Sequence, residues 1–354
     1  MYGGRFPATA RLMKESTYFT NAISSAPLTP ISHASILTGL QPRNHGVRHL
    51  FRERIRRNAK MIQQILQENG YVTGAIVSCP GMNRWYGFSR GFETYDDEIP
   101  RLPDGSDPLN TVDVKLRGLA LKPANKVSER ATAWLERNGR SPFALFIHFF
   151  DAHWPYSAPK GFGGANAYEN SLAFVDYHLG VVLKKLEELG LDKNTTVVCF
   201  SDHGEDLNGL YENDKGGKRL GHPEELGHGC LLYDQTQKVV LIIRDAGFSK
   251  NREIRAQARL VDIFPTVLDL LKIKYDGHVD GISLLQNAKI PRIAYSETFF
   301  PDELDKKRPE FSAAVSKKAI RIENKYKIIF NIGSDEVEVY DLENDPHEQR
   351  NLNI

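Results

Sequence analysis

The chain has 354 residues, of which 41% are hydrophobic and 26% charged, and its formal net charge at pH 7 is +1. This composition is that of a globular protein larger than one small core, and it excludes an intrinsically disordered chain. The near-zero net charge gives no bulk attraction to nucleic acid or to an anionic membrane, and no apolar run approaches the roughly 20 residues that span a bilayer. Its three cysteines lie far apart, which argues against a disulfide framework and against a Cys-based zinc site.

Apolar, strand-like runs alternate with amphipathic helical segments along most of the chain. We predict helices at 7–15, 59–69, 127–138, 168–189 and 260–271, and strands at 71–77, 143–150, 195–201 and 239–243. This alternation is typical of a layered α/β domain with a mostly parallel central sheet. We assign that domain to residues 1–290.

The pattern changes near Pro291. Residues 319–332 and 336–342 alternate as in a hairpin, with Gly333-Ser334-Asp335 as its turn. We therefore predict a small antiparallel C-terminal subdomain over residues 291–354. The long polar stretches 97–124 and 206–226 are predicted loops, and loops of this length in a compact domain are usually functional or inserted.

A Pro-broken loop before residue 30 presents several hydroxyl groups and runs into a short apolar segment. Ser32 is suited to cap a helix that ends at Gly39. Thr29 then lies just before a helix N-terminus, where the helix dipole and the free N–H groups favour an anion. A hydroxyl beside an anion site suits a nucleophile for an oxyanion ester. An ordinary capped loop explains the same residues equally well.

Other polar clusters follow or precede the predicted strands. Asp202 and His203 come directly after strand 195–201, at the strand end where open parallel sheets bind ligands, and they offer an oxygen and a nitrogen ligand to a divalent cation. His153 lies among aromatic residues after strand 143–150, and His228 stands between two glycines. Each cluster alone is explained as well by loop hydrogen bonds. Their joint placement at sheet ends indicates an active site.

Together these segments resemble the sulfatase family of the alkaline phosphatase superfamily. The resemblance is carried by Thr29–Val47, Asp151–Tyr156, Ser201–Glu205, Gly227–Asp234, Val261–Thr266 and Tyr340–Leu352. It implies that family's α/β fold, with helices on both faces of the sheet. It also implies a divalent metal ion (Ca²⁺, Mn²⁺, Mg²⁺ or Zn²⁺) held by Asp202 and His203.

The same resemblance implies roles for the remaining site residues. Thr29 would be the nucleophile, and His33, which replaces the family's Arg, would orient it. His153 and His228 would contact the ester oxygens or protonate the leaving oxygen, and His228 would alternatively complete the metal shell.

Two departures from the family pattern shape the expected reaction. Sulfatases carry a Cys or Ser that becomes formylglycine, whereas Thr29 cannot form that aldehyde. An unmodified threonine is the nucleophile in phosphodiesterase-type members, so the resemblance implies a phosphoester hydrolase with a covalent Thr29 intermediate. True sulfuric ester hydrolysis is an alternative. The family's first strand, with its metal-binding aspartates, is missing before Tyr2, so a catalytically impaired relative that binds an anion or a partner is a further alternative.

The expected partner is a small-molecule, glycan-linked or lipid-linked phosphate or sulfate ester, and no nucleic acid or membrane span is expected. No signal-peptide pattern opens the chain, which implies the cytoplasm if Met1 is the true start. The sequence leaves the substrate, the compartment and the oligomeric state open.

Overall fold

The computed structural model describes residues 4–102, 104–111, 114–207, 216–225, 227–286, 292–304, 314–334 and 336–353. The chain divides into two compact units. The first contains Met1–Ser16 and Met61–Val197, and the second contains Thr17–Lys60 and Val198–Ile354.

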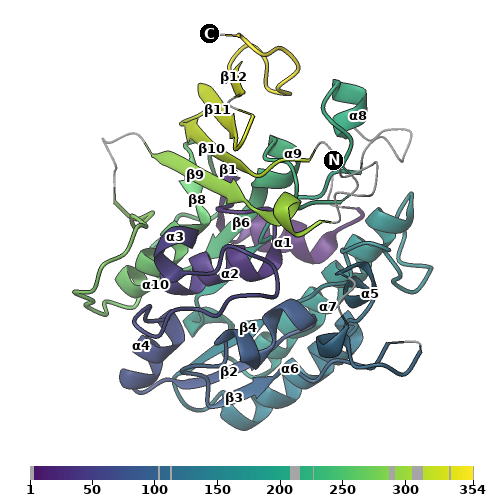
Figure 1. Cartoon of the computed structure of the whole chain (residues 1–354). Coiled ribbons are helices and arrows are strands. Elements are labelled where there is room, and N and C mark those ends of the chain that lie inside the picture. Colours follow the sequence, from purple (N-terminus) through teal and green to yellow (C-terminus); the bar gives the residue numbers. More distant parts are fainter. Residues whose placement is uncertain are drawn as a thin grey trace. The chain divides into compact units, whose positions relative to one another are not determined.

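The first unit is built on a three-stranded sheet in the order β3-β2-β4, in which both neighbouring pairs are parallel (Figure 1). Its strands are β2 (Val72–Ile76), β3 (Thr94–Asp96) and β4 (Phe143–Ile147). Its α-helices are α1 (Pro7–Lys14), α4 (Ile62–Glu68), α5 (Val114–Gly118), α6 (Ala124–Asn138) and α7 (Ala167–Glu188). Short 3₁₀ turns lie at Pro80–Met82, Arg84–Tyr86, Pro108–Asn110 and Asp192–Asn194.

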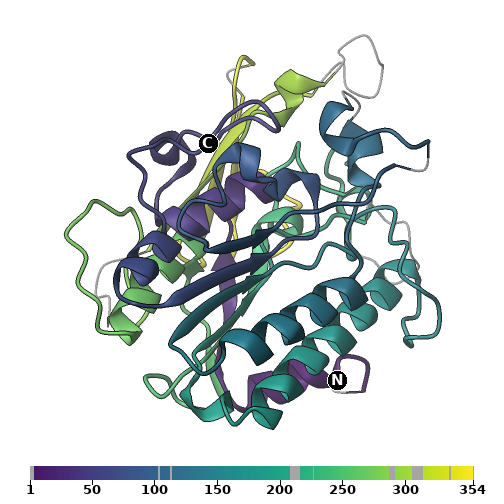
Figure 2. The ribbon, with the colours of Figure 1, turned by 90° about the horizontal axis from the view of Figure 1, so that it is seen from below.

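Helix α6 packs on β2 and β4, and α7 packs on α6 and α1 (Figure 2). The ring of Trp134 on α6 lies so close to Gly74 of β2 that a Cβ there would come within 2.4 Å of it. The same indole donates a 2.7 Å hydrogen bond to Thr94 Oγ1. On α7, the buried carboxylate of Asp176 accepts hydrogen bonds from the backbone N–H groups of Ala8 and Thr9, so it caps the first turn of α1.

The second unit contains a mixed five-stranded sheet in the order β5-β6-β1-β7, with β8 also paired to β1. Strand β1 is antiparallel to β6 and parallel to β7 and β8. The strands are β1 (Thr17–Ile23), β5 (Val197–Phe200), β6 (Lys238–Arg244), β7 (Arg252–Ile254) and β8 (Ala258–Arg259). The helices of this unit are α2 (Thr29–Thr38), α3 (Pro42–His45), α8 (Gly217–Leu220), α9 (Asp234–Gln237), the 3₁₀ helix η5 (Leu260–Asp262) and α10 (Ile263–Leu270).

The core of this sheet is apolar and includes one side chain from α2. Its buried members are Phe19, Ala22, Ile36, Val239, Leu241, Ile243, Ala258, Leu260 and Ile263. Because Ile36 belongs to this cluster, the packing of α2 on the sheet fixes the helix whose first residue is Thr29.

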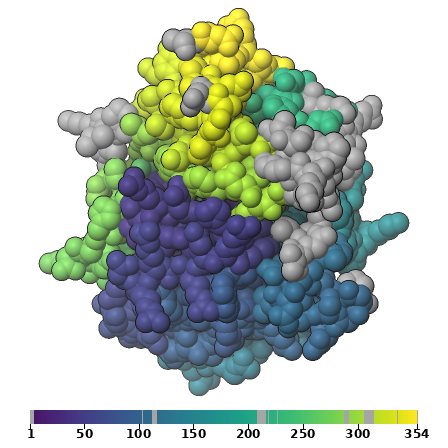
Figure 3. All heavy atoms as spheres, in the orientation of Figure 1, coloured from purple at the N-terminus to yellow at the C-terminus, as the bar shows by residue number. Residues whose placement is uncertain are grey.

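A four-stranded antiparallel sheet in the order β12-β11-β10-β9 completes the second unit. Its strands are β9 (Ile293–Thr298), β10 (Lys317–Ile322), β11 (Tyr326–Asn331) and β12 (Val337–Asp341), and the 3₁₀ helix η6 (Phe300–Glu303) follows β9. Lys327, which is 2% exposed, pairs with Asp234 and Glu348 and so ties α9 to the C-terminal tail. In Figure 3 the yellow-green residues of this sheet adjoin the purple residues after α2, in keeping with the ion pair between Arg48 and Glu297.

The predicted α/β class is confirmed, and each predicted helix and strand before residue 291 has an observed counterpart with shifted ends. In contrast to the predicted parallel arrangement, β1 and β6 are antiparallel. Helix 260–271 is a 3₁₀ turn followed by α10, and Pro265 fits because it occupies the first turn of α10. No helix in the described part of the chain is long and apolar enough to cross a membrane.

The strand predictions were incomplete. The sequence analysis predicts no strand at β1, β3, β7, β8 or β9, and it predicts residues 319–332 as one strand. The structure has two strands there, because the backbone turns at Glu323, whose φ is 52°, and β10 and β11 form a hairpin. Gly333 and Ser334 do lie in a turn between β11 and β12, and Asp335 lies outside the described residues.

The remaining predictions concern segments that the structure describes in part. The predicted loop 97–124 contains a 3₁₀ turn and α5, and 206–226 contains α8. Residues 208–215 and 226 of the second loop, and the predicted domain boundary at 290/291, lie outside the described ranges. The division into 1–290 and 291–354 stays a prediction.

Candidate active site

Thr29 is the first residue of α2, not the residue before a later helix start. The helix is preceded by Leu28 in an extended conformation, and Ser32 is fully buried inside it, so the prediction that Ser32 is the N-cap was wrong. The reason is Pro30, which was read as breaking the chain. Proline is favoured in a first helical turn, because its fixed φ suits the helix and its missing N–H costs no hydrogen bond there.

The hydroxyl of Thr29 faces the imidazole of His203, which follows β5. Thr29 Oγ1 lies 3.3 Å from His203 Nε2, and His203 Nδ1 donates a 2.8 Å hydrogen bond to the carbonyl of Gly204. That second bond assigns the proton of a neutral ring to Nδ1 and leaves the lone pair of Nε2 directed at Thr29. Burial lowers the pKa of His203 against the opposing effect of Asp202, so the neutral ring is favoured.

Asp202 lies on the other side of this contact. Its Oδ2 is 3.5 Å from His203 Nε2 and 3.4 Å from His33 Nδ1. His33 Nδ1 is also 2.9 Å from the carbonyl oxygen of Thr29, one helical turn earlier. His33 therefore lies between the backbone of Thr29 and the carboxylate of Asp202, and its orienting role stays a prediction.

Two buried serines hold the backbone of Asp202. Ser24 Oγ and Ser32 Oγ donate hydrogen bonds of 2.6 and 2.7 Å to the Asp202 carbonyl oxygen. Both hydroxyls belong to the segment around Thr29, so they hold the end of β5 against the start of α2. The sequence reasoning assigned neither serine to the site.

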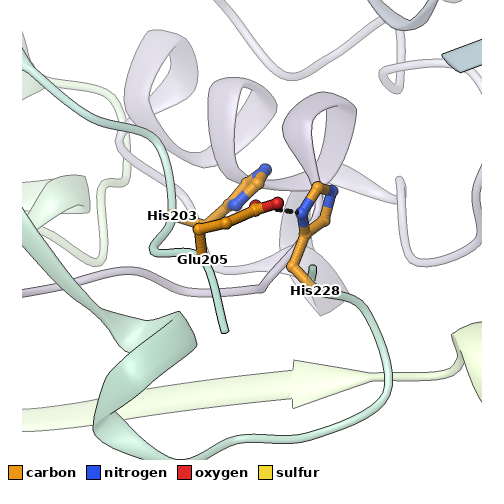
Figure 4. Close-up of side chains that lie close together, drawn as sticks. All are labelled: His203, Glu205 and His228. Atoms are coloured by element: carbon orange, nitrogen blue, oxygen red, sulfur yellow. Dashed lines mark hydrogen bonds and ion pairs between the residues drawn. The ribbon is translucent and has the colours of Figure 1, made fainter. Parts of the chain in front are cut away.

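His228 forms an ion pair with Glu205, three residues after Asp202. Its Nδ1 lies 2.8 Å from Glu205 Oε2, and its ring centroid is 4.0 Å from that of His203. Figure 4 shows the Glu205 carboxylate extended toward His228, with the His203 ring beside it. Burial lowers the pKa of His228, but the charge and hydrogen bond of Glu205 outweigh it, so the net pKa is raised. The structure thus brings His228 to His203, as the sequence reasoning expected, and adds Glu205.

The donor atoms around Thr29 fit a divalent cation. Two ligand atoms bound about 2.1 Å from one ion lie roughly 3 to 3.5 Å apart, and the distances from His203 Nε2 to Asp202 Oδ2 and to Thr29 Oγ1 are 3.5 and 3.3 Å. A carboxylate, a neutral imidazole and a hydroxyl also form a donor set that Zn²⁺, Mn²⁺ or Mg²⁺ accepts.

A second grouping shares one of these residues. Ligand atoms of His203, Glu205 and His228 lie within 4.8 Å of one another. In the described structure Glu205 already holds His228 by a hydrogen bond, whereas Asp202 and Thr29 face His203 Nε2 directly. Asp202 and His203 stay the predicted metal ligands, and His228 stays the predicted alternative ligand.

His153 belongs to the first unit, in the loop after β4. Its ring stacks on Phe150 with centroids 4.2 Å apart, and its Nδ1 donates a 2.6 Å hydrogen bond to the carbonyl of Trp154. Asp151, 2% exposed, accepts a 3.0 Å hydrogen bond from the N–H of Ala124 at the start of α6. This loop is thus fixed within its own unit, and the role of His153 at Thr29 stays a prediction.

Among the residues that the sequence reasoning missed, only Glu205 had a visible signal. It belongs to the segment Ser201–Glu205, which was singled out for its Asp-His pair, but its partner His228 is 23 residues away. Ser24 and Ser32 had no such signal, because buried serines are common and their partner is a backbone carbonyl.

The chain is similar in sequence to known sulfatases. The family model described as Sulfatase matches residues 2–273. The mouse (Mus musculus) steryl-sulfatase is 31% identical over 168 residues, which are 45% of this chain and 26% of that protein. The ulvan-active sulfatase of Formosa agariphila is 24% identical over 328 residues, which are 80% of this chain and 60% of that protein. The chain thus spans less than two thirds of these relatives.

Solved structures share the fold over nearly the whole chain. A protein in complex with its substrate D-glucosamine-2-N,6-O-disulfate has a TM-score of 0.74 and 17% identity, covering 98% of this chain and 88% of that one. The phosphonate monoester hydrolase of Agrobacterium radiobacter has a TM-score of 0.73 and 18% identity, covering 98% of this chain and 86% of that one.

Proposed function

Because the chain belongs to the sulfatase family of ester hydrolases, we propose that it hydrolyses phosphate or sulfate esters through a covalent intermediate on Thr29. The observation that carries this proposal is the 3.3 Å contact between Thr29 Oγ1 and His203 Nε2 beside the carboxylate of Asp202. A hydroxyl held against such a pair is the arrangement of an activated nucleophile.

The residues divide the reaction between them. Thr29 Oγ1 gives its proton to the adjoining Asp202–His203 pair and forms the new bond to phosphorus or sulfur while the bond to the leaving oxygen breaks, and water later cleaves the Thr29 ester. The N-terminus of α2, at Thr29 itself, favours the negative charge on the oxygens of the transferred group. His228, whose pKa Glu205 raises, is suited to give a proton to the leaving oxygen.

A divalent ion would be held by Asp202 and His203. When bound there, it supplies positive charge beside Thr29 Oγ1 and the ester oxygens. Such an ion agrees with the donor set described above, and the choice among Ca²⁺, Mn²⁺, Mg²⁺ and Zn²⁺ stays open.

Within this proposal, phosphoesters are the first candidate substrates. Thr29 stands where formylglycine-forming sulfatases need Cys or Ser, and a threonine cannot form that aldehyde. The named relatives are sulfatases, whereas a phosphonate monoester hydrolase has the same fold, so sulfate esters are the second candidate.

Parallel assays test the proposal. We expect turnover of bis-p-nitrophenyl phosphate or p-nitrophenyl phosphate to exceed that of p-nitrophenyl sulfate, and mass spectrometry of acid-quenched enzyme to find the transferred group on the peptide that contains Thr29. Faster turnover of the sulfate would reverse the preference. An impaired relative, the third possibility, would turn over none of the three esters and would contain no stoichiometric divalent ion.

A further inference from the structure

Residues 43–60, which follow the nucleophile helix, carry a strong local positive charge. Seven of the 46 Lys and Arg residues lie in this segment but only one of the 45 Asp and Glu residues, so it carries +6 while the rest of the chain carries −5. Six of the seven basic residues are arginines. These 18 residues thus carry a net charge opposite in sign to that of the rest of the chain.

The arginine side chains of this segment reach the surface. Arg43, Arg52, Arg54, Arg56 and Arg57 are exposed, and Figure 3 shows the purple residues of this part of the chain on one face of the second unit. Within residues 43–60, all of which the structure describes, no large hydrophobic side chain is exposed. The segment therefore offers guanidinium groups without an apolar element to insert into a bilayer or an aromatic face on which bases stack.

The segment is held next to the loop that carries His228. Arg52 pairs with Glu303 of η6 at 3.3 Å, and the N–H of Leu50 donates a 2.7 Å hydrogen bond to the same carboxylate. At the other end of η6, a Cβ on Gly229 would come within 2.7 Å of the ring of Phe300. The short helix η6 therefore lies between Arg52 and Gly229, the residue that follows His228.

A second set of contacts fixes the segment to β9. Arg48 binds Glu297 through two hydrogen bonds of 2.7 and 2.9 Å and lies over the ring of Phe299 at 4.4 Å. The backbone N–H of Glu297 in turn donates a 3.0 Å hydrogen bond to the carbonyl of Ser25, four residues before Thr29, so β9 borders the loop that precedes α2. Arg48 and Arg52 thus anchor the segment beside the site, and the outward arginines project from that anchored frame.

We propose that residues 43–57 form an exosite for a polysaccharide that carries repeated sulfate or phosphate groups, one of which is the ester cleaved at Thr29. This inference rests on the proposed function. The planar fork of arginine matches the oxygens of sulfate and phosphate, and several arginines spread over 15 residues match a charged chain better than a single ester group.

Heparin, as a sulfated polysaccharide, is the binding probe. The test variant combines Arg43→Gln, Arg54→Gln and Arg57→Gln, and the matched control combines Lys250→Gln, Lys272→Gln and Lys274→Gln. The control removes the same charge from exposed positions of the same unit. We expect the Kd for heparin at fixed salt to rise about tenfold in the test variant and to change by less than about twofold in the control.

Salt and competitor measurements decide the kind of partner. Because each neutralised anion releases counterions, the log–log dependence of affinity on salt should become shallower in the test variant only. Tighter binding of the wild type to phosphatidylglycerol vesicles or to oligothymidylate than to heparin would overturn the proposal. Equal heparin affinities of the test variant and the control would overturn it too.

Turnover of p-nitrophenyl esters, with the thermal unfolding midpoint, separates this inference from the proposed function. We expect the test variant to unfold at the wild-type temperature and to keep wild-type turnover of these small esters. Wild-type ester turnover with unchanged heparin affinity in the variant refutes the exosite alone. If the test variant loses heparin affinity but neither the wild type nor any variant turns over an ester, the proposed function is refuted. The claim that an ester of the bound polysaccharide is cleaved at Thr29 is then refuted with it.

Discussion

The hydroxyl oxygen of Thr29 lies 3.3 Å from Nε2 of His203, although 174 residues separate them in the sequence. The contact exists because α2 begins at Thr29, and because Ser24 and Ser32 hold the backbone that precedes His203. It brings the Thr29 hydroxyl, an imidazole lone pair and the carboxylate of Asp202 into one place.

Replacing Thr29 tests the nucleophile. We expect Thr29→Ala to lower kcat for bis-p-nitrophenyl phosphate by at least about 10³-fold, because alanine lacks the oxygen that is proposed to attack the ester. Thr29→Ser, the matched control, keeps the oxygen and should keep measurable turnover. The free energy of unfolding of either variant should change by less than about 1 kcal/mol. Wild-type turnover by Thr29→Ala would show that another group attacks.

Metal analysis tests the ligands. We expect purified protein to contain about one divalent ion per chain, and Asp202→Asn to lose it together with about 10²-fold or more of kcat/KM. Asp269→Asn, at an exposed position on α10, should change neither. Chelation should inactivate the wild type, and readdition of single cations will identify which ion restores turnover. A stoichiometric ion that survives in Asp202→Asn would exclude Asp202 as a ligand.

The backbone beside His228 depends on Gly229. Its φ is +123°, and a Cβ there would come within 2.7 Å of the Phe300 ring. We expect Gly229→Ala to cost about 1–3 kcal/mol in backbone strain, and the clash to displace His228 and lower kcat. Gly333→Ala is the control, because Gly333 also has a positive φ, of +95°, but has no heavy atom within 4 Å of a Cβ.

Comparing the two variants separates strain from function. Denaturant unfolding should show a loss of stability in both, whereas steady-state assays should show a lower kcat in Gly229→Ala only. Equal kcat values would mean that the loop tolerates movement of His228.

The buried carboxyl of Asp151 predicts a pH dependence of stability in the loop before His153. Burial raises its pKa from 3.8 to about 6, against the hydrogen bond from Ala124. The folded state therefore holds this proton more tightly than the unfolded state, and the group stabilises the fold most below about pH 4. That contribution is lost as the pH rises through 6, by at most about 3 kcal/mol at 1.36 kcal/mol per pKa unit.

Asp151→Asn removes this titration while keeping an oxygen for the Ala124 N–H. We expect the free energy of unfolding, measured in denaturant at pH 4.5 and pH 7.5, to depend less on pH in this variant than in the wild type. The control Asp276→Asn, at an exposed position, should keep the wild-type dependence. An unchanged dependence in Asp151→Asn would mean that this carboxyl ionises normally in the folded protein.

Local patterns were enough to predict most elements before residue 291. The apolar periodicity of residues 168–189 predicts α7, because a helix that buries one stripe repeats its apolar residues at helical spacing. The continuous apolar run from residue 143 predicts β4, because a strand buried on both faces is apolar throughout. Strand β1 left no such pattern. Its neighbours β6, β7 and β8 are more than 200 residues away, and Thr20 and Asn21 interrupt its apolar residues.

The sequence by itself determined which residue types are predicted to carry the chemistry: a threonine before a short helix, an Asp-His pair after a strand, and a histidine between glycines. These are local patterns that chain order preserves. Only the tertiary structure decided that α2 begins at Thr29, that Glu205 holds His228, and that Ser24 and Ser32 hold Asp202. Those contacts join segments that pack together only when β1, β5 and β6 form one sheet, so no local pattern contains them.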